Sequence, residues 1–151
     1  MNRFRFRLEN VLRVRGAEEE AKKRDFGEAR REARKAEERL EDTRREIEEH
    51  DHLAEDREAR PLNARDLLIH FQYSRQLERK KESNLQLLKH TEVIVDARRK
   101  ELVEANRRKK TLERLRERAM LEHNMAANKE EQAVLDELTA QKLKPSQPRE
   151  E

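Results

Sequence analysis

The chain is poor in several residue types, and each shortage excludes a class of protein. Its 151 residues include no cysteine, two glycines, three prolines and only 3% aromatic residues. The lack of cysteine excludes disulfides and thiolate metal sites. No apolar stretch approaches the ~20 residues that a membrane span needs, and the first eight residues lack an apolar signal-peptide core. We therefore expect a cytoplasmic protein.

Charged residues dominate what is present. They make up 47% of the chain, with 37 basic and 34 acidic side chains and a net charge of +3. Such polarity is typical of disordered chains, but these are usually rich in glycine and proline, and here strong helix formers prevail instead. With 33% AVILMFWYC residues the chain cannot fill a wide core. It can fill a narrow seam, since each helix of a coiled coil needs only a thin apolar stripe.

Proline divides the chain. Pro61 ends a first helix, and Asn63 is a suitable N-cap for a second. Pro145 and Pro148 lie in a polar tail. We predict an all-α fold in which two long helices form an antiparallel coiled-coil hairpin with the second helix longer. The predicted bounds are a single hairpin over 1–144, helix 1 at about 8–57, the bend at about 58–63, helix 2 at about 64–142 and a disordered tail at 145–151.

A heptad pattern defines the seam of the first helix. Upstream, Val14, Ala17 and Ala21 keep the 3,4 rhythm in another phase, which predicts a phase shift near Gly27. The regular heptad comprises Phe26, Ala29, Ala33, Ala36, Leu40, Thr43, Ile47, His50 and Ala54. The less regular seam of the second helix comprises Leu85, Leu88, Val95, Leu102, Ala105, Leu112, Leu115 and Ala119, with Thr91 and Arg98 in the gaps.

A short bend makes the two helices antiparallel neighbours. If the bend centres on Arg60 and Pro61, the numbers of facing residues add up to about 121. This pairs Phe26 with Val95, Ala33 with Leu88 and Ala36 with Leu85. Helix 1 then runs out when helix 2 reaches about residue 115, and helix 2 projects alone for roughly 25 residues, or about 40 Å.

Three segments resemble a known family. They are Phe4-x-Phe6-x-Leu8-x-x-Val11-Leu12-x-x-Arg15 with Glu18-Glu19-Glu20-Ala21, the stretch Leu62–Glu78, and Asn128–Leu138. Together they resemble the FliJ family of flagellar export proteins, which are related to the YscO-type stalk proteins of type III secretion. Some relatives carry aromatics on helix 1 near the bend, whereas 43–50 has none here.

The resemblance implies a function. FliJ proteins resemble the central stalk of rotary ATPases, insert the open end of their hairpin into the hexameric export ATPase, and contact the cytoplasmic domain of the membrane export gate nearer the bend. They promote ATPase assembly and activity and have a general chaperone-like role, with export chaperones as further partner candidates. The resemblance thus implies a non-enzymatic protein, peripheral to the cytoplasmic face of the inner membrane through its partners.

Candidate contacts lie at both ends of the hairpin. The N-terminal residues around Phe4 and Phe6 either pack on Leu112, Leu115 and Ala119 or anchor the chain in the ATPase ring. The apolar residues after 119 contact a partner protein, helix 1 or a second copy of the chain. The aromatic cluster after the bend is either a cap or the gate contact. The ATPase-ring candidates are Phe4, Phe6, Leu8, Arg107, Arg108, Met120, Leu121, Met125, Leu135 and Leu138. The export-gate candidates are Leu67, Phe71, Tyr73 and Leu77.

Charge is unevenly distributed along the chain. Residues 37–58 contain eleven acidic residues and four arginines, whereas residues 98–118 contain ten basic and four acidic residues. We predict an acidic bend and a basic open end. These blocks are either solvated faces or surfaces that steer a partner.

Nothing in the pattern indicates catalysis or cofactor binding. His50 and His52 are spaced i,i+2, so they point to different faces, and zinc sites on helices use i,i+4. There is no glycine-rich phosphate loop, and a two-helix rod offers no water-excluding pocket. We expect no catalytic, cofactor or metal site and no small-molecule substrate. A generic cytoplasmic coiled-coil scaffold is the alternative. Nucleic-acid binding is the weaker one, because the basic runs are interleaved with glutamates.

Overall fold

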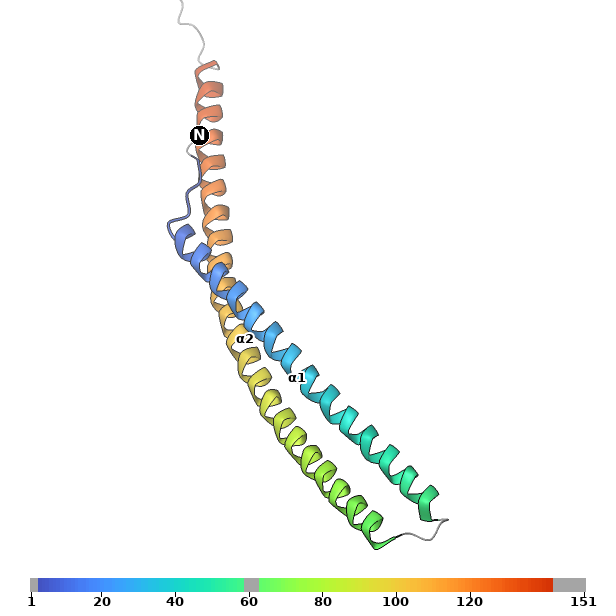
Figure 1. The fold of residues 1–151 in the computed structure, drawn as a ribbon. Coiled ribbons are helices and arrows are strands. Elements are labelled where there is room, and N and C mark those ends of the chain that lie inside the picture. Colours follow the sequence, from blue (N-terminus) through green and yellow to red (C-terminus); the bar gives the residue numbers. More distant parts are fainter. Residues whose placement is uncertain (1–2, 59–62, 143–151) are drawn as a thin grey trace, which may run out of the picture. The chain divides into compact units, whose positions relative to one another are not determined.

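The computed structural model describes residues 3–58 and 63–142, except for the side chains of 55–58 and 142. The described chain contains two helices, α1 (Glu9–Glu58) and α2 (Ala64–Lys142), and no strand. The helices run antiparallel and pack on each other (Figure 1). The all-α fold with two packed helices and a longer second helix is confirmed. Residues 59–62 of the predicted bend and the predicted tail lie outside the described residues.

Local signals in the sequence set the helix starts. Asn63 accepts a hydrogen bond from the Arg65 backbone N–H at 3.4 Å through Oδ1, and its carbonyl accepts one from Leu67 at 3.2 Å. This is the arrangement of an N-cap, as expected for Asn63. Glu9 and Asp66 lie in the first turns of α1 and α2, where the helix dipole favours a negative charge.

The chain divides into two compact units, and each contains a part of both helices. The middle unit comprises Glu18–Ala105, and the terminal unit comprises Met1–Ala17 with Asn106–Glu151.

The seam of the middle unit follows the predicted heptad of α1. Every position of that heptad from Phe26 to Ala54 is buried or half-buried, with Ala36 and Leu40 at 2% and 3% exposure. On the opposite side, α2 contributes Leu77, which is 3% exposed, and Ala105. The small alanines of α1 leave room for the larger side chains of α2.

The register differs from the predicted one. The numbers of paired residues add up to 123 for Lys22 and Glu101, and to 127 for Thr43 and Asn84. The predicted value of about 121 is lower than both of these sums. Ala33 and Leu88 nevertheless line one surface hollow together with Val95.

Polar side chains occupy several layers of this seam. Thr43 is fully buried; its hydroxyl donates to the Arg39 carbonyl at 2.9 Å and accepts from Asn84 Nδ2 at 2.9 Å. A second polar layer joins Lys22 Nζ to Glu101 Oε2 at 2.7 Å. Polar partners at seam positions specify register, because a slipped register would leave them unpaired.

The predicted phase shift near Gly27 is wrong. Val14 is 55% exposed and Ala17 is also exposed, so neither lies in a seam. Glu19, which is buried, and Lys22, which is half-buried, instead continue the 3,4 spacing of the heptad without a break, and the predicted seam residue Ala21 is half-buried as well. The aliphatic stems of such side chains cover apolar surface while their charged ends find polar partners.

Candidate functional site

Residues 3–8 lie against α2 at the end of the terminal unit without being helical. Phe4 and Phe6 are half-buried, whereas Arg3, Arg5 and Arg7 are exposed, so aromatic and basic side chains alternate between α2 and solvent. We call residues 3–8 the N-terminal segment. In Figure 1 it runs beside α2.

Two contacts anchor the N-terminal segment on α2. The ring of Phe4 lies 5.6 Å from that of His123, and Phe6 shares a hollow with Leu115 and Ala119. The Phe pair therefore packs on the end of the hairpin, which is one of the two alternatives that the sequence left open. The predicted seam residue Leu115 is nevertheless 43% exposed, because a non-helical segment covers less of α2 than a helix does.

Beyond His123, α2 continues without cover from α1. The sequence predicted such an overhang from about residue 115, but the N-terminal segment extends the covered stretch to His123. The overhang, defined as residues 124–142, bears apolar side chains that are largely exposed, and Met120 and Leu121 precede it. The exposed fractions are 50% for Met120, 64% for Leu121, 65% for Met125, 56% for Val134, 62% for Leu135 and 50% for Leu138.

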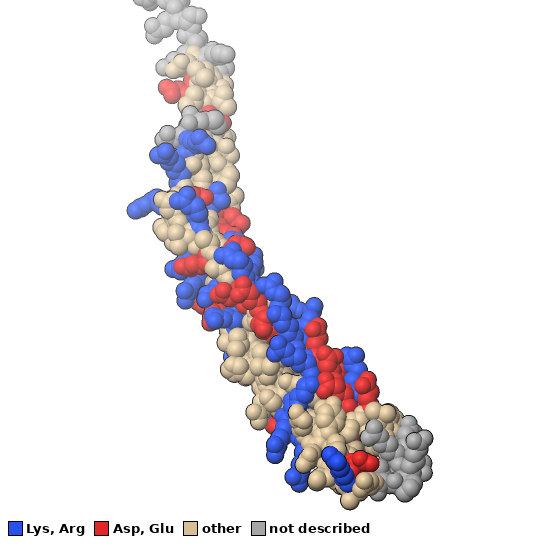
Figure 2. All heavy atoms as spheres, in the orientation of Figure 1, with Lys and Arg blue, Asp and Glu red and all other residues tan. Residues whose placement is uncertain are grey.

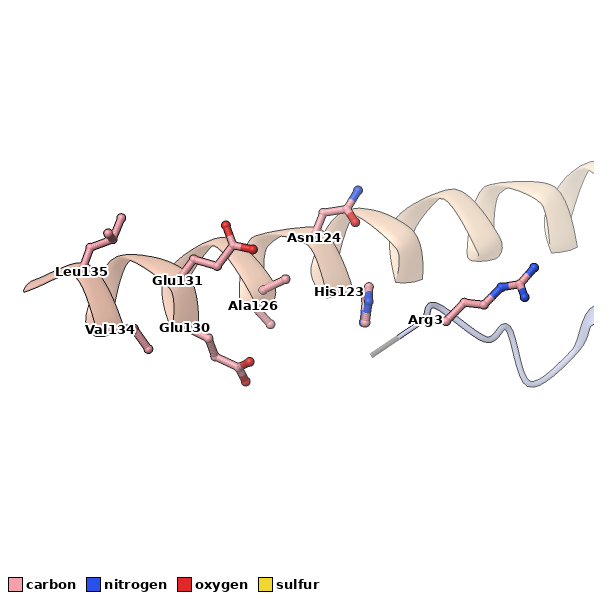
Figure 3. Close-up of a pocket in the computed structure, with 9 residues that line it drawn as sticks. Arg3, His123, Asn124, Ala126, Glu130, Glu131, Val134 and Leu135 are labelled. Carbon is pink, nitrogen blue, oxygen red and sulfur yellow. The ribbon is translucent and has the colours of Figure 1, made fainter. Parts of the chain in front are cut away.

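One side of the overhang forms an open groove of about 1040 Å³ (Figure 3). Ala127, Val134 and Leu135 supply its apolar lining, and Glu130 and Glu131 supply its charge. Arg3 and His123 lie at its end, and Figure 3 shows Glu130 and Val134 on the side of the helix from which Arg3 approaches. We call this the overhang groove. Its lining comes from one helix and the N-terminal segment, so it suits a polypeptide better than an enclosed small molecule.

Charge changes sign along the terminal unit. Basic residues dominate the N-terminal segment and the stretch 107–118, where Arg116 Nε pairs with Glu9 at 3.3 Å and Lys109 pairs with Glu113 at 3.8 Å. Figure 2 shows blue side chains gathered here, while the end of α2 is mostly uncharged on the visible face. From 124 to 141 the only basic residue is Lys129, against Glu130, Glu131, Asp136 and Glu137. The predicted basic open end is thus a basic zone followed by an acidic, apolar tip.

Arg107 and Arg108 lie in this basic zone. Both side chains are exposed, so they are accessible to a partner. Their role in a ring contact stays a prediction.

A second apolar surface lies at the start of α2, in the middle unit. We call it the bend patch, and its exposed members are Leu67, Leu68, Ile69, Phe71 and Tyr73, at 42%, 57%, 56%, 57% and 44%. Leu77, predicted as part of the same contact, is 3% exposed. It points into the seam, so it cannot touch a partner while the helices are packed, and its assignment to the contact surface is corrected.

His50 and His70 make ring contacts with the aromatic residues of the bend patch. His50 of α1 stacks on His70 of α2 with ring centroids 4.4 Å apart, and it meets the Tyr73 ring at 4.8 Å. Its Nε2 also lies 3.0 Å from Ser74 Oγ. Sequence reasoning placed His50 in the seam but missed His70 and Ser74, although both fall at the 4,3 spacing that leads to Leu77. Of the bend patch, Tyr73 is thus held against α1 by the ring of His50.

No metal site or membrane span emerges from the described chain. Residues 3–58 and 63–142 contain no group of three or more His, Asp or Glu side chains arranged for an ion. Neither described helix has a stretch apolar enough to cross a bilayer.

Comparison with known families settles the relationship suggested by the sequence. The model for the family described as "Flagellar FliJ protein" matches residues 4–147, nearly the whole chain. The chain belongs to the FliJ family. The resemblance seen in the sequence is thereby confirmed, and FliJ membership implies a role related to flagellar export. No curated protein and no solved structure matches the chain.

Proposed function

We propose that this FliJ-family protein is a stalk-like adaptor of the flagellar export ATPase. Its terminal unit enters the hexameric ATPase ring and promotes ring assembly and activity. Its bend patch contacts the cytoplasmic domain of the membrane export gate. The protein itself carries out no chemistry, because ATP hydrolysis belongs to the ring, and it is peripheral to the inner membrane through these partners.

The observation that carries the proposal is the exposed apolar surface of the overhang. Met125 and Leu135 on the overhang and Leu121 just before it are each more than 60% exposed, and within the described chain α1 does not cover the overhang. At about 25 cal/mol per Å² of buried apolar area, such side chains favour association once a partner surface is available. The ring candidates Met120 and Leu138 lie on the same helix.

The N-terminal candidates contribute differently. Leu8 is 39% exposed and Arg107 and Arg108 are accessible, whereas Phe4 and Phe6 are half-buried against α2. We infer that the Phe pair holds the N-terminal segment in place, and that Leu8 and the arginines meet the ring. Basic side chains around the rod would speed the encounter with acidic ring surfaces.

The bend patch supports a second contact. Phe71 and Tyr73 are exposed aromatic residues, a type that is enriched at protein interfaces, and Leu67 adds exposed apolar area beside them. Because His50 packs on Tyr73 from α1, the patch is preorganised and loses little conformational entropy on binding. Export chaperones are further candidates for the same surface.

The test is the turnover and hexamerisation of the purified export ATPase with and without this protein. Leu121→Ser combined with Leu135→Ser should abolish the stimulation that the wild type gives. Val93→Ser is the matched control, because Val93 is 68% exposed in the middle unit, away from the proposed contact. No stimulation by the wild type, or self-association alone, would favour the generic scaffold instead. A steeply salt-dependent shift of DNA mobility would favour nucleic-acid binding.

A further inference from the structure

The overhang groove continues a surface of α2 that already holds a polypeptide segment. The N-terminal segment lies on α2 from Leu115 to His123, with Phe4 against His123 and Phe6 near Ala119. The groove begins at His123 and extends along the same helix to Leu135. The adjoining stretch thus demonstrates which kind of segment this part of α2 accommodates.

The chemistry of the groove differs from that of the adjoining stretch in one respect, its charge. Ala127, Val134 and Leu135 give it apolar contacts for aromatic or aliphatic side chains. Glu130 and Glu131 border them, and neither carboxylate has an ion-pair partner within the described chain. A bound segment with basic residues would form charge-assisted hydrogen bonds with these two carboxylates. Without such a segment, the exposed carboxylates lack these bonds.

We propose that the overhang groove binds a partner segment in which basic residues alternate with aromatic or aliphatic ones. Such a segment lies along α2 as a continuation of the N-terminal segment, with its apolar side chains on Ala127 and Val134 and its basic side chains at Glu130 and Glu131. The proposal deepens the stalk function and rests on it only for the partner's location. It predicts that the partner presents a basic and apolar segment to the tip of α2. Around the basic zone of α2, by contrast, the partner is expected to present an acidic surface.

The test uses a fluorescent peptide with the sequence of residues 3–8, Arg-Phe-Arg-Phe-Arg-Leu, titrated into the full chain. Binding should be saturable and should weaken at least tenfold in Glu130→Lys. Asp136→Lys is the matched control, since it makes the same change in net charge on the same helix but Asp136 does not line the groove. Methyl NMR signals of Val134 and Leu135 should shift on binding.

Four outcomes of the titration would overturn the inference, and a dependence of the affinity on protein concentration is a fifth. They are no binding, equal weakening by Glu130→Lys and Asp136→Lys, equal binding of a peptide with glutamates in place of the arginines, and tighter binding in Phe4→Ala with Phe6→Ala. The last would mean that the peptide merely replaces the N-terminal segment on Leu115–His123. If binding requires two copies of the chain, the affinity will depend on protein concentration, and the groove is then an interface between copies, which also contradicts a monomeric site.

This experiment is independent of the stalk function. It contains no ATPase, so failure of the peptide to bind leaves ATPase stimulation unaffected. Loss of ATPase stimulation with intact peptide binding would remove the proposed function and leave the groove as a peptide site.

Discussion

Single polar residues in the seam of the middle unit set the pairing of the two helices. Thr43 and Asn84 form one such layer, with Nδ2 and Oγ1 2.9 Å apart. A buried polar atom that loses its partner costs far more than a hydrogen bond contributes, so such layers penalise any other register.

The first prediction concerns this layer. Thr43→Val should destabilise the protein by about 1–3 kcal/mol, because it removes the hydroxyl that accepts a hydrogen bond from Asn84 Nδ2. The Asn84 amide then keeps only its longer hydrogen bond to the Arg39 carbonyl. Adding Asn84→Leu should recover much of the loss, as both polar groups are then gone. Urea unfolding followed by circular dichroism measures the cycle. The control is Thr111→Val, an exposed threonine with the same bond to the carbonyl four residues earlier; equal costs at 43 and 111 would contradict the prediction.

The second prediction is a pH dependence at Glu101. The hydrogen bond from Lys22, together with that from Arg98, lowers the pKa of the Glu101 carboxyl below its usual value of 4.5. The unfolded chain therefore binds a proton more readily than the folded one, so this contribution to stability is present above pH 4.5 and is lost as the pH falls through the folded-state pKa. The melting temperature of Glu101→Gln should lie below that of the wild type at neutral pH, and the difference should vanish in acid.

A control for Glu101 lies on the same helix. Glu137 is exposed and makes no ion pair with the described residues. Glu137→Gln should match the wild type across the whole pH range. If the melting temperatures of wild type and Glu101→Gln differed by the same amount from neutral to acid pH, lost packing and not lost charge would explain the difference.

At the scale of the helix, the sequence predicted α1 better than α2. From Phe26 to Ala54 the seam positions of α1 are mainly apolar, so periodicity finds them. Upstream, apolar Val14 and Ala17 lie outside the seam and the buried position belongs to Glu19, so a search for apolar residues follows the wrong phase.

The same physical reason explains the gaps on α2. His70, Ser74 and Asn84 occupy seam positions through hydrogen bonds and ring contacts that depend on residues of α1. A pattern search along one helix cannot detect such pairings. For the N-terminal segment the sequence left two alternatives open, although the alternation of Phe and Arg from Arg3 to Arg7 has the period of two that an irregular or extended segment shows.

The third prediction concerns the two glycines of α1. A Cβ added to Gly16 or Gly27 would meet no atom within 4 Å. Each change to alanine should stabilise the protein by about 0.5–1 kcal/mol, because glycine in a helix interior loses more backbone entropy on folding. Thermal unfolding measures the gain. A loss of stability in Gly27→Ala would show that α1 needs the glycine, for instance as a bending point.

At the scale of the whole molecule, the terminal unit contains a stretch of α2 that other parts of the chain partly cover and a stretch that they leave uncovered. Contacts of α2 with α1 and with the N-terminal segment, such as Arg116–Glu9 and His123–Phe4, end where the overhang begins. A helix without tertiary packing is marginally stable in water, and its stability comes chiefly from neighbouring helices.

The fourth prediction follows from this difference. Limited trypsin digestion should cut first at Lys129 in the overhang, and later at Lys81, which is half-buried in the middle unit. Mass spectrometry of early fragments identifies the sites. Binding of the export ATPase should protect Lys129 if the overhang enters the ring. Cleavage at Lys81 before Lys129 would mean that the overhang is more stable than its lack of packing indicates.

The alternation of Phe and Arg in the N-terminal segment has a consequence for sequence change. In a heptad, adding one residue rotates the helix and moves every seam side chain partly out of place. In a segment with a period of two, one added residue between Phe6 and Leu8 would exchange the two sides, so that arginines face α2 and both rings face water. Two added residues would restore the original sides. Insertions before Glu9 should therefore be tolerated in even numbers and rejected in odd ones, a parity rule that no other part of the described chain imposes.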